Sequence, residues 1–250
     1  MNTFTTTRFP RKRVAASVLL ALALAACSGE KPETMLASAR DYMAKDDYKS
    51  AVIQVKNALQ ENPELPEARY ILGLALLKSG DPVGAETELR KARSLGQPDE
   101  LVVPPLVQAM LMLGKSKDVV EDFAGVQLTT PAAKAQYQTT LATAHAAQGS
   151  VERARQALAA ALEADPAYAP ALLIQAGELA RQAKFDEALA VVDGILAKDD
   201  KNAEAWKLKG DLLQIGKNQS DEAMQAYRKA IEIQPNYVLA HSAILTYQFK

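Results

Sequence analysis

A small side chain returns about every 34 residues along most of this chain. One series steps by 34 or 35 residues: Ala51, Ala85, Val119, Ala154, Ala188 and Ala223. A second series, offset from the first, has one larger member: Ala39, Gly73, Val107, Ala142, Ala176 and Gly210. Self-similarity at a fixed period of roughly 20 to 50 residues is typical of arrays that stack one small unit repeatedly. This period constrains the fold more than any other feature of the sequence.

The repeated unit is seen best in residues 203–235. Trp206, Gly210 and Leu213 follow an i, i+4, i+7 spacing, which places them on one face of a helix. A turn rich in Gly, Asn and Ser comes next, and a second apolar face runs from Ala223 to the proline that ends the unit. The pattern predicts a helical hairpin with one unburied side, which needs a neighbour to cover it.

This period, with its Trp–Gly–Ala–Pro spacing, resembles the tetratricopeptide repeat. The resemblance implies an all-α fold, a right-handed α-solenoid of stacked helical hairpins over residues 33–250. The expected repeats are 32–65, 66–99, 100–134, 135–168, 169–202 and 203–236, with a partial repeat at 237–250. The alternative is chance amphipathicity of unrelated helices, which the simultaneous register of six units disfavours.

Small residues are expected where the two helices of a hairpin cross, because they let the backbones approach closely. The residues predicted to pack the repeats are Ala51, Gly73, Ala85, Ala154, Ala188, Trp206, Gly210 and Ala223. The third repeat is the most divergent, since Pro104 and Pro105 fall early in its first helix. Proline has no N–H to donate, so we expect that helix to begin late, at or after Pro104.

The first 26 residues predict a signal peptide rather than a folded segment. Four basic residues between 8 and 13 precede an apolar stretch at 14–26. That stretch is too short for a helix that spans a bilayer, which needs about 20 residues.

The apolar stretch ends Leu24-Ala25-Ala26-Cys27, which resembles the lipobox of bacterial lipoproteins. The resemblance implies cleavage between Ala26 and Cys27, lipidation of the Cys27 thiol, and a lipidated tether at 27–32. The alternative is an ordinary secretory signal with an incidental cysteine, although this cysteine is the only one in the chain.

Removal of residues 1–26 would leave 25 Lys and Arg residues against 30 Asp and Glu, a net charge of −5. An acidic chain without basic runs disfavours nucleic acid as a partner. Several acyl chains on Cys27 would anchor the protein stably to a membrane. In the lipoproteins that the tetrad resembles, aspartate after the cysteine commonly marks retention in the inner membrane. Ser28 stands there in this sequence, so the resemblance implies the outer membrane of a Gram-negative bacterium, with the array on its periplasmic face.

Residues that could carry chemistry are few and scattered. His145 occupies the slot that Tyr42 fills in the first repeat, and His241 occupies the slot of Trp206. Both are expected to be packing or surface residues, because neither has a metal-ligand partner at suitable spacing. The sequence predicts no enzyme, metal, cofactor or small-molecule substrate. The alternative, an enzyme acting on polysaccharide, would need two carboxylates converging in one pocket.

The family resemblance implies that the first helices line a concave groove that binds protein partners. The groove slots lie three residues before, and one and four after, the small residue of each first helix. Candidate groove residues in these slots are Arg40, Tyr70, Leu74, Gln108, Lys207 and Gln214. The N-terminal slots are more apolar, with Leu36, Leu77 and Pro104 among them. Packing against neighbouring helices is the alternative for each apolar slot residue.

Some members of the family bind C-terminal carboxylates through a Lys–Asn–Asn pattern at these slots. The corresponding residues here are Lys207, Asp211 and Gln214. This set departs from the pattern, because Asp211 would repel a carboxylate. Carboxylate binding is therefore not expected at these slots.

A closer resemblance rests on three segments, LAACSGEKPE, KSAVIQVKNALQENP and GLALLKSGDPVGAETELRKA. They resemble the tetratricopeptide lipoproteins of the PEP-CTERM/exosortase system, found in Gram-negative bacteria that make exopolysaccharide. The resemblance implies a periplasmic scaffold serving exopolysaccharide export or surface-protein sorting. The alternative is a structural or pilotin-like subunit of an outer-membrane assembly, such as a pilus or secretion system.

The sequence ends in a half-repeat with an apolar character. Ile244, Leu245, Tyr247 and Phe249 lie within its last seven residues. The terminal element of a solenoid needs a polar outer face. The pattern therefore predicts that the natural array continues into further repeats.

Overall fold

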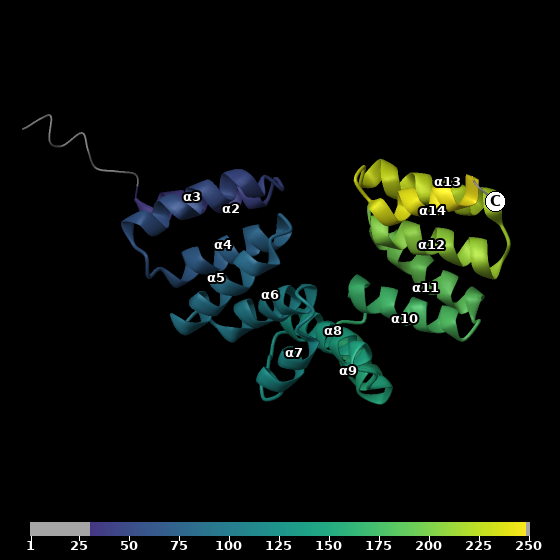
Figure 1. Cartoon of the computed structure of the whole chain (residues 1–250), viewed down its shortest axis with the longest axis horizontal. Coiled ribbons are helices and arrows are strands. Elements are labelled where there is room, and N and C mark those ends of the chain that lie inside the picture. The colour runs from purple at the N-terminus through teal and green to yellow at the C-terminus, as the bar shows by residue number, and fades with distance from the viewer. Residues whose placement is uncertain (1–30, 249–250) are drawn as a thin grey trace, which may run out of the picture.

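The computed structural model describes residues 31–248, and every regular element in that range is an α-helix (Figure 1). The helices are α2 (Pro32–Met43), α3 (Tyr48–Glu61), α4 (Pro66–Lys78), α5 (Pro82–Ser94), α6 (Asp99–Met112), α7 (Ser116–Asp122), α8 (Pro131–Ala147), α9 (Val151–Ala164), α10 (Ala169–Arg181), α11 (Phe185–Lys198), α12 (Ala203–Gly216), α13 (Ser220–Ile233) and α14 (Val238–Gln248). The predicted signal segment 1–26, its cleavage site and Cys27 lie outside the described residues.

Consecutive helices pair into hairpins, and each hairpin contacts mainly the next one along the chain. Figure 1 shows the hairpins following an arc, with α2 and α3 at one end and α13 and α14 at the other. The hairpin of α8 and α9 lies between these two ends. Contacts restricted to sequence neighbours define a solenoid, and this one is all-α.

Small residues lie where the helices of a hairpin meet. Four are fully buried and the last is 6% exposed: Ala51, Ala85, Ala188, Ala223 and Ala154. A Cβ atom on Gly73 would lie 2.6 Å from Cγ of Leu89, and one on Gly210 would lie 2.4 Å from Cε1 of Tyr227. Real Cβ atoms do not approach other atoms so closely. Both glycines are therefore required by the large side chain opposite them.

Three of the repeat boundaries share a polar contact. A side chain in the first helix meets a backbone carbonyl in the linker six residues earlier. The pairs are Arg69 with Pro63, Trp206 with Asp200, and His241 with Pro235. Their nitrogen–oxygen distances run from 2.8 to 3.1 Å. Three different residue types thus form hydrogen bonds with linker carbonyls that have no partner within a helix.

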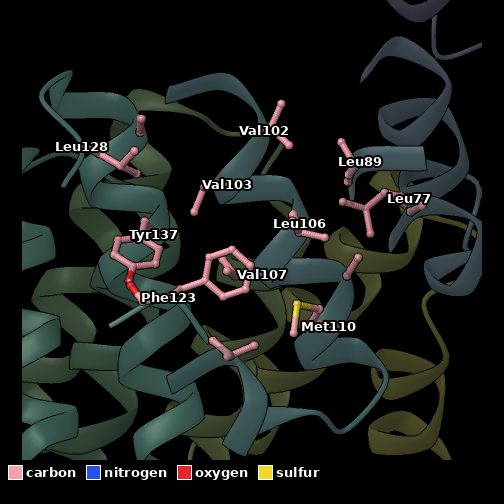
Figure 2. Packing of buried hydrophobic residues seen from close by; sticks show 14 of the residues in the cluster. Leu77, Leu89, Val102, Val103, Leu106, Val107, Met110, Phe123, Leu128 and Tyr137 are labelled. Atoms are coloured by element: carbon pink, nitrogen blue, oxygen red, sulfur yellow. The ribbon is translucent and has the colours of Figure 1, made fainter. Parts of the chain in front are cut away.

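The largest buried cluster lies between the second and fourth repeats (Figure 2). Phe123, which follows α7, belongs to this cluster and is 1% exposed. The hydroxyl of Tyr137 on α8 donates to the carbonyl of Phe123 at 2.6 Å. Burial raises the pKa of Tyr137. This hydrogen bond fixes the end of the short second helix of the divergent third repeat against the fourth.

The expected late start of the first helix in the third repeat is wrong. α6 begins at Asp99, and Pro104 and Pro105 lie inside it. Each proline removes one helical hydrogen bond, so the carbonyls of Glu100 and Leu101 lose their usual partners. The helix nevertheless continues, because both prolines are buried in an apolar surface that extends around most of it. Tertiary packing outweighs the missing bonds.

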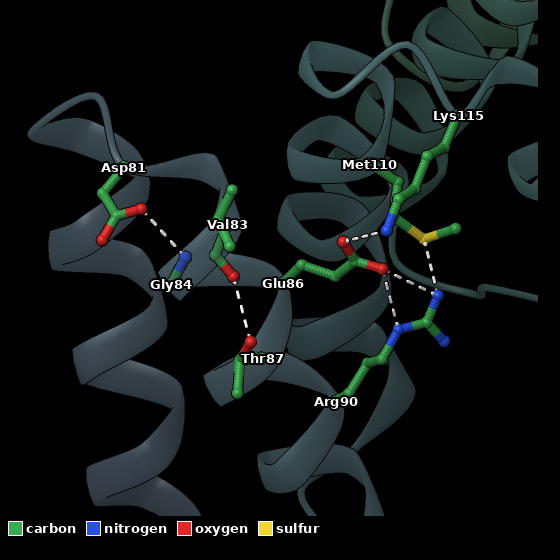
Figure 3. A network of polar contacts seen from close by, with 8 residues as sticks. All are labelled: Asp81, Val83, Gly84, Glu86, Thr87, Arg90, Met110 and Lys115. Carbon is green, nitrogen blue, oxygen red and sulfur yellow. Dashed lines mark hydrogen bonds and ion pairs between the residues drawn. The ribbon is translucent and has the colours of Figure 1, made fainter.

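A polar network joins the second repeat to the turn after α6 (Figure 3). Glu86 on α5 is 8% exposed and accepts hydrogen bonds from Nζ of Lys115 at 2.7 Å and Nε of Arg90 at 3.1 Å. Burial alone would raise the pKa of Glu86, but the hydrogen bonds and charges of Lys115 and Arg90 together lower it. The buried carboxylate is therefore compensated from both sides, as a buried charge requires.

Candidate partner-binding groove

Three apolar slot residues in the N-terminal half belong to the core. Leu36 is 5% exposed and Leu77 is 7% exposed. Pro104 is buried within α6. Packing between helices, the alternative considered for them, accounts for these three side chains.

The four candidate groove residues of the N-terminal half are only partly available. Arg40 is exposed but pairs with Glu67, and Gln108 is exposed and accepts from the amide of Gln136 at 3.4 Å. The other two are half-buried, Tyr70 and Leu74. Burial raises the pKa of Tyr70. The polar groups of this half are thus engaged mainly with neighbouring repeats.

The two candidate groove residues of the C-terminal half lie on α12. Lys207 is half-buried and its Nζ donates to Oδ2 of Asp211 at 2.6 Å. The other oxygen of Asp211 accepts from the hydroxyl of Tyr227 at 3.0 Å. Burial, then the charge of Asp211 and the hydrogen bond to it, raises the pKa of Tyr227. The carboxylate is therefore held between a cation on its own helix and a phenol on α13.

A cavity of about 360 Å³ opens beside this network, between α12, α13 and α14. Its lining combines polar and apolar side chains: Lys207, Gln214, Ile215, Tyr227, Leu239, Ser242, Ala243 and Thr246. Ile215 is 75% exposed and Leu239 is 58% exposed. The cavity therefore offers an apolar wall beside amide, hydroxyl and ammonium groups.

A second cavity of about 340 Å³ lies between α10, α11 and α12. It is lined by Gly177, Ala180, Arg181, Phe185, Leu208, Asp211, Leu212 and Ile215. Ile215 lines both cavities, which are therefore neighbours along α12. We call the two cavities together the α12 groove.

Several residues of the α12 groove escape the slot rule used for the sequence. Tyr227 and Phe185 come from second helices, and Ile215 and Leu239 come from positions outside the three slots. Sequence signals for Ile215 and Leu239 exist, because both are large apolar residues beside predicted turns. Their exposure depends on how neighbouring hairpins are placed, which the sequence pattern does not state.

The two histidines and the acidic side chains of the described residues are scattered along the array. Between residues 31 and 248, no three His, Cys, Asp or Glu side chains gather where they could hold a metal ion. None of the helices α2 to α14 combines the length and apolar character needed to cross a membrane. His241 is exposed, and His145 is half-buried beside a different cavity. The α12 groove, by contrast, combines apolar and polar side chains, which is typical of sites that bind small ligands or peptide side chains.

Tetratricopeptide-repeat family models match three parts of the chain, residues 36–100, 145–212 and 203–237. The gap between the first two matches covers most of the divergent third repeat and the start of the fourth. No curated protein sequence matches this chain.

Solved structures share the fold at low sequence identity. A chain of the APC/C hetero-tetramer Cut9–Hcn1 is similar over 92% of this chain, with a TM-score of 0.67 and 15% identity. This chain spans 45% of that one. PilW, a widely conserved type IV pilus biogenesis factor, has a TM-score of 0.62 and 16% identity, and the match covers 85% of this chain and 98% of PilW. PilF of Pseudomonas aeruginosa has a TM-score of 0.58 and 14% identity, covering 86% and 97%.

Family models and solved structures thus agree with the helical hairpins and their period. Tetratricopeptide-repeat proteins are generally non-enzymatic scaffolds that bind protein partners. This chain belongs to the tetratricopeptide-repeat family.

Proposed function

We propose that the protein is a non-enzymatic scaffold that binds a protein partner in the α12 groove. The observation that carries this proposal is the pair of adjoining cavities that share Ile215, a side chain 75% exposed on a helix otherwise packed into the array. A large apolar side chain in this position can act as an anchor for a partner, with the polar lining fixing orientation.

The groove is tested by Ile215→Glu, which places a charge at the point shared by both cavities. Ile53→Glu is the matched control, because Ile53 is 58% exposed on α3, far along the chain from the groove. Cross-linked partners recovered from membranes of the source bacterium should fall at least about tenfold with Ile215→Glu, the cost of a central contact. They should stay unchanged with Ile53→Glu, and equal recovery from both variants would contradict the proposal.

We further propose that Cys27 is lipidated and anchors the scaffold to the outer membrane, on its periplasmic face. The lipobox-like tetrad ending at Cys27 supports this proposal. Cys27→Ala should move the protein from the membrane fraction to the soluble fraction, because the acyl chains are its anchor. Persistence of the variant in the membrane fraction would rule out lipidation as the anchor.

For the cellular role, we propose exopolysaccharide export or sorting of PEP-CTERM surface proteins. Support comes from the sequence segments that resemble the tetratricopeptide lipoproteins of that system. Deletion of the gene should reduce surface exopolysaccharide or release PEP-CTERM proteins. Restoration by the wild-type gene, and not by Ile215→Glu, would connect the role to the groove.

A second candidate is a structural or pilotin-like subunit of an outer-membrane assembly. The likeness of fold to PilW and to PilF, which spans nearly the whole of each, favours it. The two roles differ in stoichiometry after purification from membranes. A subunit of a pilus or secretion system stays in fixed ratio with its assembly through washing, whereas a scaffold exchanges its clients.

A further inference from the structure

The junction between the fourth and fifth repeats differs from the other junctions. Within residues 31–248, α9 contacts α10 less than any other second helix contacts the first helix of the following repeat. The buried cluster at this junction is small and consists mainly of alanines. Loose packing here leaves part of the α8 and α9 surface open.

One residue on this surface breaks the pattern of the array. His145 lies three residues after Ala142, the small residue of its helix. In four other repeats this position holds an aliphatic or sulfur-containing side chain: Leu76, Met110, Leu179 and Leu213. Those four pack into the apolar clusters that join one repeat to another. Among the six full repeats, only the fourth carries an imidazole at this position.

A shallow, open cavity of about 330 Å³ lies beside His145, and Arg153 and Gln156 at its edge are exposed. Its lining is Gln138, Leu141, His145, Arg153, Gln156 and Ala157, and we call it the His145 cavity. The four polar side chains can all donate hydrogen bonds, and none of the six lining residues is acidic. His145 and Arg153 are the titratable groups of this lining, and they face each other from α8 and α9.

Arg153 has no carboxylate within 4.0 Å among the described residues. Arginines elsewhere in that range mostly have one: Arg40, Arg69, Arg90, Arg93, Arg155 and Arg181. The exception besides Arg153 is Arg228, on α13 and away from the cavity. A guanidinium forms its strongest hydrogen bonds with carboxylates or phosphates, often in bidentate geometry.

We propose that the His145 cavity binds a carboxylate of an acidic protein segment, with Arg153 as the cation and His145, Gln138 and Gln156 as additional donors. Charge complementarity supports this occupant, because the lining supplies donors and a positive charge without an internal counter-ion. The site is lined by α8 and α9 alone and shares no lining residue with the α12 groove, so the two sites are separate.

The chain has two histidines, which makes imidazole NMR a direct measurement. The full chain is titrated with N-acetyl-triglutamate amide while the imidazole signals of His145 and His241 are followed. The His145 signal should move saturably and the His241 signal should not. The neutral N-acetyl-triglutamine amide should leave both signals in place.

Two charge-removing variants test the contact. Arg153→Gln should weaken binding of the triglutamate peptide at least about fivefold, because it removes a charge-assisted hydrogen bond. Arg228→Gln removes the same unpaired charge outside the cavity and should change binding less than about twofold. Ile215→Glu should also leave binding intact, which separates this site from the proposed groove.

Four results would overturn the proposal: no shift of His145, equal shifts of both histidines, equal weakening by Arg153→Gln and Arg228→Gln, or binding of the triglutamine peptide as strong as that of triglutamate. A shift produced by inorganic phosphate and not by the triglutamate peptide would also overturn it. That result would show a site for free anions instead of a protein carboxylate.

Discussion

At the residue scale, one carboxylate binds the two residues that precede the first helix of the fourth repeat. Glu100 in the first turn of α6 accepts hydrogen bonds from the hydroxyls of Thr129 and Thr130 at 2.7 and 2.8 Å. The backbone N–H groups of the same two threonines also donate to it. The backbone hydrogen bond from Thr129, followed by the threonine hydroxyls, lowers the pKa of Glu100 from 4.5 to about 2.

This contact predicts sensitivity to acid. A carboxyl with a lowered pKa in the folded state contributes stability above pH 4.5, and that contribution is lost as the pH falls from 4.5 towards 2. Glu100→Gln should lower the melting temperature at pH 7 and flatten its decline across this acid range. Melting curves by circular dichroism would measure both effects, and an equal acid decline in wild type and variant would contradict the prediction.

His145 supplies a second prediction at this scale. Burial, followed by the charge of Arg153, lowers the pKa of His145 below 6.5. Arg153→Gln should raise the pKa of His145 while leaving it below 6.5, because burial remains. Titration of the imidazole signals by NMR measures this change. Arg155→Gln is the control, since Arg155 pairs with Glu152 and lines another cavity; a comparable rise with it would argue against a local effect of Arg153.

At the element scale, glycines inside helices have opposite roles at different positions. Gly210 in α12 faces the ring of Tyr227, where an added Cβ would lie 2.4 Å from Cε1. Gly194 lies within α11, and an added Cβ there would meet nothing within 4 Å. The same chemical change therefore has a steric cost at one position and none at the other.

Gly210→Ala should destabilise the protein by about 1–3 kcal/mol, because the Tyr227 ring must move and overpacking is costly. Gly194→Ala should stabilise it by roughly 0.5–1 kcal/mol, since alanine has less backbone freedom to lose in a helix. Urea unfolding of both variants would test the pair. Changes of the same sign would show that helix propensity, and not the approach of the helices, governs these positions.

The error at α6 has a physical cause at the element scale. Local rules for proline concern hydrogen bonds within one helix, and they predict that Pro104 and Pro105 delay its start. The structure shows a helix buried from Val102 to Met110 apart from Gln108. Packing around that surface stabilises a helix that local rules disfavour.

At the scale of the whole molecule, coupling between repeats is uneven. The cluster that joins the second to the fourth repeat is large and includes the buried ring of Phe123. The junction of α9 with α10 has a small buried cluster and a cavity beside Arg155 on its surface. In a solenoid, stability is roughly a sum of repeat and interface contributions, so the array should divide most easily there.

Hydrogen exchange tests this division. Amides of α10 to α13 should lose protection together in urea, at a concentration different from that for α4 to α8. The physical reason is that the weak interface transmits little stability between the two groups of hairpins. His145→Leu, which restores an apolar side chain at the junction, should bring the two transitions closer. A single transition for all helices of the wild-type protein would contradict the prediction.

The sequence predicted some residues of the candidate site correctly and others incorrectly. Slot rules selected Lys207 and Gln214, which line the α12 groove. They also selected Leu36, Leu77 and Pro104, which are buried. An apolar slot residue has the same sequence signal whether it faces a partner or a neighbouring helix. Whether such a residue is exposed or buried depends on the distance between hairpins, which the sequence of a single repeat does not specify.

The sequence by itself determined the unit and its stacking. Helix periodicity and small residues at a 34-residue step are local properties, and they specify a hairpin that must bury one side against its neighbour. Only the tertiary structure decided where the stack is tight and where it opens. The α12 groove arises from the fit between successive hairpins, and the His145 cavity lies between the two helices of one hairpin. Such a fit depends on side chains from several helices acting together, whereas the repeat pattern describes each helix alone.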